Sequence, residues 1–195
     1  MAKGYRQREL ERTAVHEAGH GTFAVLMDVP FRRVTILPDE TFAGRMDLGK
    51  VEPPAHVDPF NENWDVKAAR QYWAARICGA LAGPLAETLY TKCWQQQSVS
   101  DEDTDEAKAW EIADYFYTPA KADRWVNRLR FKTLERLRMP DVQAAVDAVA
   151  RELLRRKTLT AAKVRALVKR QGMGQRGTCG QRSTSLAGMQ RKRLV

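Results

Sequence analysis

The chain has 195 residues and a mass of 22.2 kDa, enough for one or two domains with a core that needs no disulfides. Hydrophobic residues make up 44% and charged residues 29%, proportions typical of a folded globular protein and not of a disordered one. The longest apolar run, residues 77–86, is far shorter than a membrane span, and the first ten residues lack the apolar segment of a secretory signal. We therefore expect no membrane association. Three cysteines without paired spacing (Cys78, Cys93, Cys179) favour a reducing, cytoplasmic setting.

The net charge of +9 is concentrated near the C-terminus. Residues 170–195 hold six basic side chains and no acidic one, so the rest of the chain carries only +3. Apolar periodicity also stops after Arg170, and Gly, Gln, Ser and Arg dominate from there. We expect residues 1–170 to form one folded domain and residues 171–195 to form a basic, disordered tail, the only part whose charge suits nucleic acid.

The pattern of apolar residues and helix breakers in the first third of the chain predicts a helix followed by a strand pair. The helix is expected over residues 5–27, where apolar and small residues recur at helical spacing until Pro30 stops it. Residues 31–37 and 42–48 have the composition of two paired strands. Residues 52–63 contain three prolines and are expected to form a loop.

The rest of the domain is predicted to be helical, which makes the fold class α+β and mainly helical. One helix is expected over residues 64–90, kinked or restarted at Pro84 because proline supplies no backbone donor. Pro119 and Pro140 suit first helical positions, and Thr160 suits an N-cap. Three or four further helices are expected, at about residues 104–117, 119–138, 140–157 and 160–170.

The stretch from His16 to His20, His-Glu-Ala-Gly-His, forms an H-E-x-x-H motif inside the first predicted helix. The i, i+4 spacing puts both imidazoles on one face, one turn apart, where they can bind the same zinc ion. Glu17 flanks that face and can act as the general base for a metal-bound water, whose pKa zinc lowers towards ~7. The competing explanation is a surface helix with two histidines at this spacing by chance. Gly19 argues against it, since glycine costs about 1 kcal/mol in a helix interior.

A catalytic zinc site built on this motif needs a third protein ligand. No further histidine follows the motif at ligand spacing, so the ligand must come from elsewhere in the chain. The candidates are His56, Glu87 and the acidic cluster of residues 101–106. The cluster also suits a helix start, with Asp103 as the N-cap and Glu106 reaching back to it, while His56 suits a solvated loop.

Several segments together resemble the peptidase domain of the FtsH-type zinc metalloproteases (peptidase family M41). TAVHEAGHGTFAVL and the following VTILPDETFAGRMD are similar to that family's HEAGH helix and its next strand. Three later segments are similar to its helical elements, in the same order: ICGALAGPLAETLY, DTDEAKAWEIADYF and VDAVARELLRRKTLTAAKVRALV. The resemblance covers roughly residues 9–170 and implies a zincin-like fold, Zn²⁺ as the cofactor and hydrolysis of peptide bonds.

The resemblance also implies a role for individual residues. The two histidines of the motif match the family's zinc ligands, and Glu17 matches its catalytic glutamate. Asp105 falls at the position of the aspartate ligand, with Asp103 as the alternative, and Glu87 matches a glutamate that supports the site. The chain departs from the family at Pro84, where the family has arginine. It also lacks a G-x-x-x-x-G-K-[ST] phosphate-binding loop, so we expect a free-standing peptidase domain without an ATP-driven motor.

The expected function is therefore that of a zinc endopeptidase acting on flexible or unfolded polypeptides. Such substrates would bind as an extra strand along residues 42–48. A separate unfoldase or adaptor would be needed for folded substrates, and the sequence fixes no oligomeric state. The alternative is a non-catalytic binding or scaffold protein that keeps the peptidase fold and uses its basic tail on nucleic acid or an acidic partner.

Overall fold

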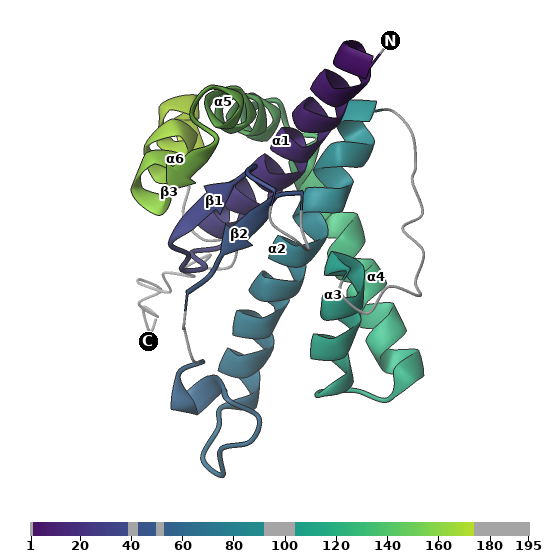
Figure 1. Ribbon diagram of the computed structural model, residues 1–195. Helices are drawn as coiled ribbons and strands as arrows, with labels where there is room; N and C mark the ends of the chain where they lie inside the picture. The colour runs from purple at the N-terminus through teal and green to yellow at the C-terminus, as the bar shows by residue number, and fades with distance from the viewer. Residues whose placement is uncertain (1, 39–42, 50–52, 92–103, 174–195) are drawn as a thin grey trace, which may run out of the picture.

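The computed structural model describes residues 2–38, 43–49, 53–91 and 104–173, with no account of the side chains of residues 2–5 and 173. This part of the chain is mainly helical and carries a small antiparallel sheet (Figure 1), so the coarse α+β prediction is confirmed. The helices are α1 (Ala2–Leu26), α2 (Val66–Thr91), α3 (Asp105–Asp114), α4 (Pro119–Leu137), α5 (Pro140–Arg156) and α6 (Ala161–Val168). The strands are β1 (Arg33–Thr35), β2 (Arg45–Asp47) and β3 (Thr158–Thr160), and two short helical turns are η1 (Ala55–Val57) and η2 (Lys169–Met173).

The helices α1 and α2 lie side by side, run in opposite directions and form the centre of the molecule (Figure 1). Small residues let them approach closely, since a Cβ on Gly19 would lie 2.6 Å from the carbonyl oxygen of Ala82. α5 and α6 pack against α1, whereas α3 and α4 pack against α2. The central pair is therefore covered on both sides, and the sheet lies over α1.

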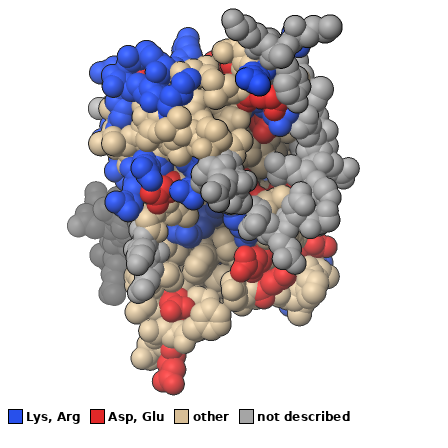
Figure 2. All heavy atoms as spheres, in the orientation of Figure 1, with Lys and Arg blue, Asp and Glu red and all other residues tan. Residues whose placement is uncertain are grey.

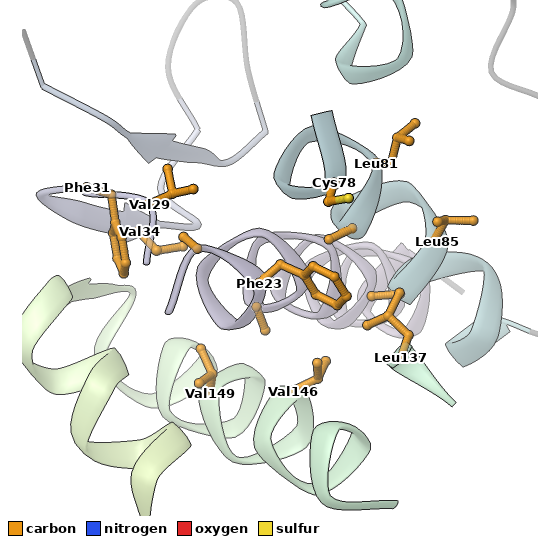
Figure 3. Close-up of a cluster of buried hydrophobic side chains, with 14 of the residues drawn as sticks. Phe23, Val29, Phe31, Val34, Cys78, Leu81, Leu85, Leu137, Val146 and Val149 are labelled. Atoms are coloured by element: carbon orange, nitrogen blue, oxygen red, sulfur yellow. The ribbon is translucent and has the colours of Figure 1, made fainter. Parts of the chain in front are cut away.

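Phe23 of α1 lies in the middle of the buried core (Figure 3). Leu85 of α2, Leu137 at the end of α4 and Val146 of α5 surround it, so one aromatic side chain joins four helices. Removing these apolar side chains from water supplies much of the free energy that holds the helices together.

The sheet has the strand order β2-β1-β3, with β1 antiparallel to both neighbours. Val34, which is fully buried, pairs with Met46 on one side and Leu159 on the other. The two strands expected within residues 31–37 and 42–48 are thus confirmed, and β2 forms an edge of the sheet. β3 was not predicted. The chain enters it directly from α5 through Lys157, which has a φ of 67°.

The sequence expectations for the starts of α4, α5 and α6 are confirmed. Pro119 and Pro140 occupy the first turns of α4 and α5, and the hydroxyl of Thr160 accepts the N–H of Lys163 as an N-cap of α6. Of the kink or restart expected at Pro84, the restart is wrong, because α2 continues through that residue as one helix. Since proline weakens a helix interior, packing against α1, α3 and α4 must keep α2 continuous.

The expected cap of α3 is also wrong. Its N-cap is Thr104, whose hydroxyl accepts a hydrogen bond from the N–H of Ala107. Glu106 does not close a capping box, and instead forms an ion pair with Arg130 of α4 at 3.2 Å. Asp103 itself and residues 174–195 of the basic tail lie outside the described residues. No helix within the described ranges is long and apolar enough to cross a membrane.

Candidate active site

Three of the side chains singled out from the sequence meet at one point beside α1. Nε2 of His16 and Nε2 of His20 lie 3.1 Å apart, and Oδ2 of Asp105 lies 3.0 Å from each of them. The histidines come from successive turns of α1, whereas Asp105 is the first residue of α3, 85 positions beyond His20. The packing of α3 against α2 brings this carboxylate to the motif.

Each imidazole is held by a partner on its other ring nitrogen. Nδ1 of His20 lies 2.8 Å from the carbonyl oxygen of Gly79, which can only accept a hydrogen bond, so the proton of this ring sits on Nδ1. Nδ1 of His16 lies 3.0 Å from Oε2 of Glu87, and Oε1 of Glu87 pairs with Arg12 at 3.0 Å. These partners orient the rings, and both Nε2 atoms turn a lone pair toward the meeting point.

This arrangement favours a positive charge at its centre. Two imidazole nitrogens and a carboxylate oxygen, 3.0–3.1 Å apart, repel one another through their lone pairs unless a proton or a metal ion lies among them. Atoms at this spacing can all lie about 2.0–2.1 Å from one point, the usual length of zinc bonds to histidine nitrogen and carboxylate oxygen. Two histidines and one carboxylate also leave one position open on a tetrahedral ion, as catalytic zinc sites do. The three residues therefore fit a zinc ion.

The electrostatics of the cluster agree with this fit. Burial alone would lower the pKa of His16, but its hydrogen bonds to Asp105 and Glu87 outweigh burial and raise that pKa to about 9. Burial likewise opposes the charged form of Asp105, yet the two neighbouring histidines hold the pKa of its carboxyl far below the usual range. The surroundings thus stabilise positive charge between the carboxylate and the imidazoles, which is the charge that a bound cation supplies.

Glu17 is a second acid of the site, and it is almost completely buried. Its side chain is 5% exposed, and its Oε2 has no hydrogen-bond partner among the described residues. Burial raises the pKa of its carboxyl, although the two histidines act in the opposite direction. Gly44 closes over it, since a Cβ on Gly44 would lie 2.9 Å from Cγ of Glu17. A carboxylate oxygen without a protein partner is suited to accept a proton from a water molecule at the site.

The cluster opens into a cleft of about 720 Å³. Residues of α1 and α2 line it, the strand β2 borders one side and α3 borders the other. Figure 2 shows this face of the molecule hollowed near its centre, with basic side chains inside the hollow. Arg45 and Met46 of β2 are among the lining residues, so an edge strand of the sheet runs along the cleft.

His56, one of the alternative ligands, is exposed on η1 and lies outside both the cluster and the cleft lining. Sequence reasoning missed three residues that shape the site. Arg12 precedes His16 by one helical turn, so its spacing was a usable signal. The carbonyl of Gly79 has no sequence signal, and neither does Gly83, where a Cβ would overlap the imidazole of His20.

A scan against models of known protein families finds no match to this chain, and a search of curated proteins finds none either. Its function is therefore inferred from the geometry of the cluster and the cleft.

Proposed function

We propose that the chain is a zinc-dependent endopeptidase, an FtsH-type peptidase domain with a zincin-like fold. The observation that carries this proposal is the meeting of His16, His20 and Asp105 beside the unpartnered, buried carboxylate oxygen of Glu17. Burying an acid without a hydrogen-bond partner costs free energy, so its presence beside a ligand cluster favours a role in chemistry.

The three clustered side chains would hold the ion, and Glu87 and Gly79 would keep the two imidazoles in the ligating orientation. When bound, zinc supplies a Lewis acid that activates water and polarises a peptide carbonyl. Glu17 accepts the proton of the attacking water and then delivers it to the leaving amine. The raised pKa of Glu17 suits this double task, because the carboxyl must hold the proton between the two transfers.

The position of β2 supports an extended polypeptide as substrate. Among the described residues, β2 pairs with β1 alone, and its residues line the cleft. An extended peptide that pairs with this edge would pass the cluster, using backbone groups that every polypeptide has. Flexible or unfolded chains can adopt this geometry directly, whereas folded substrates would need a separate unfoldase or adaptor.

The substitution Glu17→Gln tests the proposal. We expect about one zinc per chain in both the wild type and the variant, because glutamine keeps the volume and Glu17 is not a ligand. Cleavage of an unstructured peptide should fall by ~10² or more, the usual scale for loss of a general base. Glu9→Gln is the matched control, since Glu9 lies two turns earlier on α1 and outside the cleft lining.

Two results would contradict the proposal. The first is a wild-type protein that takes up no zinc when the metal is offered in excess. The second is wild-type turnover in Glu17→Gln, which would remove Glu17 as the base.

A further inference from the structure

Arg76 of α2 lines the same cleft and has no part in the mechanism above. The side chain is half-buried, and within the described ranges no carboxylate forms an ion pair with it. Its contacts are with two aromatic side chains: the guanidinium carbon lies 5.9 Å from the ring centroid of Tyr72 and 5.8 Å from that of Trp73. A cation placed in a substrate cleft without an acidic partner is a candidate for binding the substrate.

The aromatic contacts hold the guanidinium in a defined position. Trp73 is itself fixed, because its Nε1 donates a hydrogen bond to the carbonyl of Val57 at 2.9 Å. Nη1 of Arg76 also donates a hydrogen bond to the hydroxyl of Tyr72 at 3.5 Å. The remaining N–H groups of the guanidinium can donate two parallel hydrogen bonds to a carboxylate. Such bidentate pairs are among the strongest that a protein makes with an anion.

The antiparallel contact of α1 with α2 places Arg76 relative to the cluster. Glu87 of α2 lies beside His16, and Gly79 of α2 lies beside His20. Residues of α2 that precede Gly79 therefore lie beyond His20, on the side away from Glu87. A Cβ on Gly83 would lie nearest Nε2 of His20, so position 83 marks the level of the cluster on α2. Arg76 precedes Gly83 by seven residues, which is about 10 Å along a helix axis. An extended peptide advances about 3.3 Å per residue, so this distance corresponds to about three substrate residues.

Several apolar residues line the cleft on the side of Arg76. Ala80 lies one turn after it on α2, Ala24 lies one turn after His20 on α1, and the N–H of Val29 bonds the carbonyl of Ala24. All of these residues line the cleft together with Trp73. They suit an aliphatic segment that ends in an anion, while the charged side chains Arg45, Lys108 and Glu111 line other parts of the cleft wall on β2 and α3.

We propose that Arg76 binds a carboxylate of the substrate about three residues from the bond that is cleaved. This inference rests on the proposed peptidase function and adds a substrate class to it: peptides with a carboxylate at that distance. The carboxylate comes either from a Glu or Asp side chain or from the free C-terminus of the substrate, because both present the same two oxygens.

The experiment compares peptides that differ only in this carboxylate, using the full-length, zinc-loaded protein. Starting from any peptide that the wild type cleaves, Glu and Gln are exchanged at each position near the cleaved bond, and the C-terminus is left free or amidated. We expect Glu, or the free terminus, to be preferred at one position by on the order of tenfold in kcat/KM, expressed mainly in KM. Arg76→Gln should abolish this preference, Arg76→Lys should retain part of it, and Arg76→Glu should favour Lys at that position.

Zinc content of each variant serves as the folding check, and Arg70→Gln is the matched control. Arg70 lies on the same helix but stacks on Tyr117 outside the cleft lining, so its loss should leave the preference intact. Equal cleavage of Glu and Gln peptides at every position, or a preference that survives in Arg76→Gln, would overturn the inference and leave the peptidase function standing. A zinc-loaded wild type that cleaves no peptide would contradict the proposed function instead. Fluorescence anisotropy of the same labelled peptides would then decide whether Arg76 binds the carboxylate, with equal Kd values counting against it.

Discussion

The helices that carry the candidate site and the helices that complete the fold bury different kinds of side chain. At the contact of α1 with α2, the buried groups include the acid of Glu17, the imidazole of His20 and the small residues Gly19 and Ala82. The helices α4, α5 and α6 instead bury aliphatic side chains, of which Leu153 is completely enclosed. Burial of ionisable groups in the first region costs free energy of folding, and burial of apolar side chains in the second region offsets that cost.

The two regions also differ in charge. Residues 1–118 contain 13 basic and 19 acidic side chains, whereas residues 119–170 contain 15 basic and five acidic ones. The modest charge of the folded domain therefore hides a strongly basic second part, visible as blue patches in Figure 2. On α5, Glu152 lies among these cations and bonds Arg155 at 2.8 Å and Arg156 at 2.6 Å. Variants in the two regions should accordingly change different properties.

The largest expected effect is loss of the metal when both histidines of the motif are replaced. His16→Ala combined with His20→Ala removes two of the three ligands, so zinc should fall from about one per chain to none and cleavage should disappear. Metal analysis after dialysis measures the first effect, and far-ultraviolet circular dichroism checks that α1 is retained. Full zinc content in the double variant would contradict the assignment of the metal site to the histidines of α1.

Replacing the distant ligand should have a similar effect on activity. Asp105→Asn keeps the size of the side chain but removes its negative charge. Loss of a residue that only hydrogen-bonds a metal ligand typically lowers metal affinity 10- to 100-fold. Loss of the ligand Asp105 should lower zinc affinity by more than this, and cleavage should be lost. His56→Ala and Asp103→Asn are the comparison variants and should change neither. Competition with a chelator of known affinity measures the change. Normal zinc binding in Asp105→Asn together with its loss in His56→Ala would refute the ligand set.

The glycines of α2 offer a matched pair within the site region. A Cβ on Gly83 would overlap the ring of His20, so Gly83→Ala should displace that imidazole and weaken zinc binding at least tenfold. A Cβ on Gly79 would meet nothing within 4 Å, so Gly79→Ala should raise the free energy of unfolding by up to about 1 kcal/mol. Thermal melts and zinc titrations separate the two, and equal behaviour would mean that Gly83 does not make room for His20.

A variant of the second region should change the stability of the protein and leave metal binding and activity unchanged. Leu153→Ala in α5 opens a cavity at a fully buried position and should lower the free energy of unfolding by about 2–5 kcal/mol. Zinc content and kcat, measured well below the melting temperature, should stay at wild-type values because α5 contributes no residue to the cleft lining. Urea unfolding monitored by fluorescence gives the first quantity. A change in kcat without a change in stability would show that the regions are coupled.

Much of the fold could be predicted because its signals are local. Helical spacing, Pro119, Pro140 and Thr160 mark the helices of the second part, and β-branched residues mark β1. The strand β3 has three residues and pairs with β1 across more than 120 positions, so no local pattern identifies it. The continuity of α2 through Pro84 is likewise a product of packing, which overrides the local cost of proline.

The residues of the candidate site also differ in how far the sequence could predict them. His16 and His20 could be identified from spacing alone, since one turn of helix puts them on one face. Asp105 needed the resemblance of its whole segment to a family, because nothing near it in the chain indicates that α3 lies against the motif. The carbonyl of Gly79 could not be predicted, since every residue has one and only the packed structure selects it.

The separation of 85 positions between His20 and Asp105 has a consequence for the folding of the protein. An ion bound to both would close a long loop of chain and fasten α3, one wall of the cleft, to the helix that carries the motif. Uptake of the metal and ordering of that wall would then be a single equilibrium, worth about 2.7 kcal/mol at a zinc concentration one hundred times the Kd. Withdrawal of zinc would thus loosen the wall of the cleft at the same moment as it removes the proposed catalytic centre, and the metal-free protein would be the less stable form.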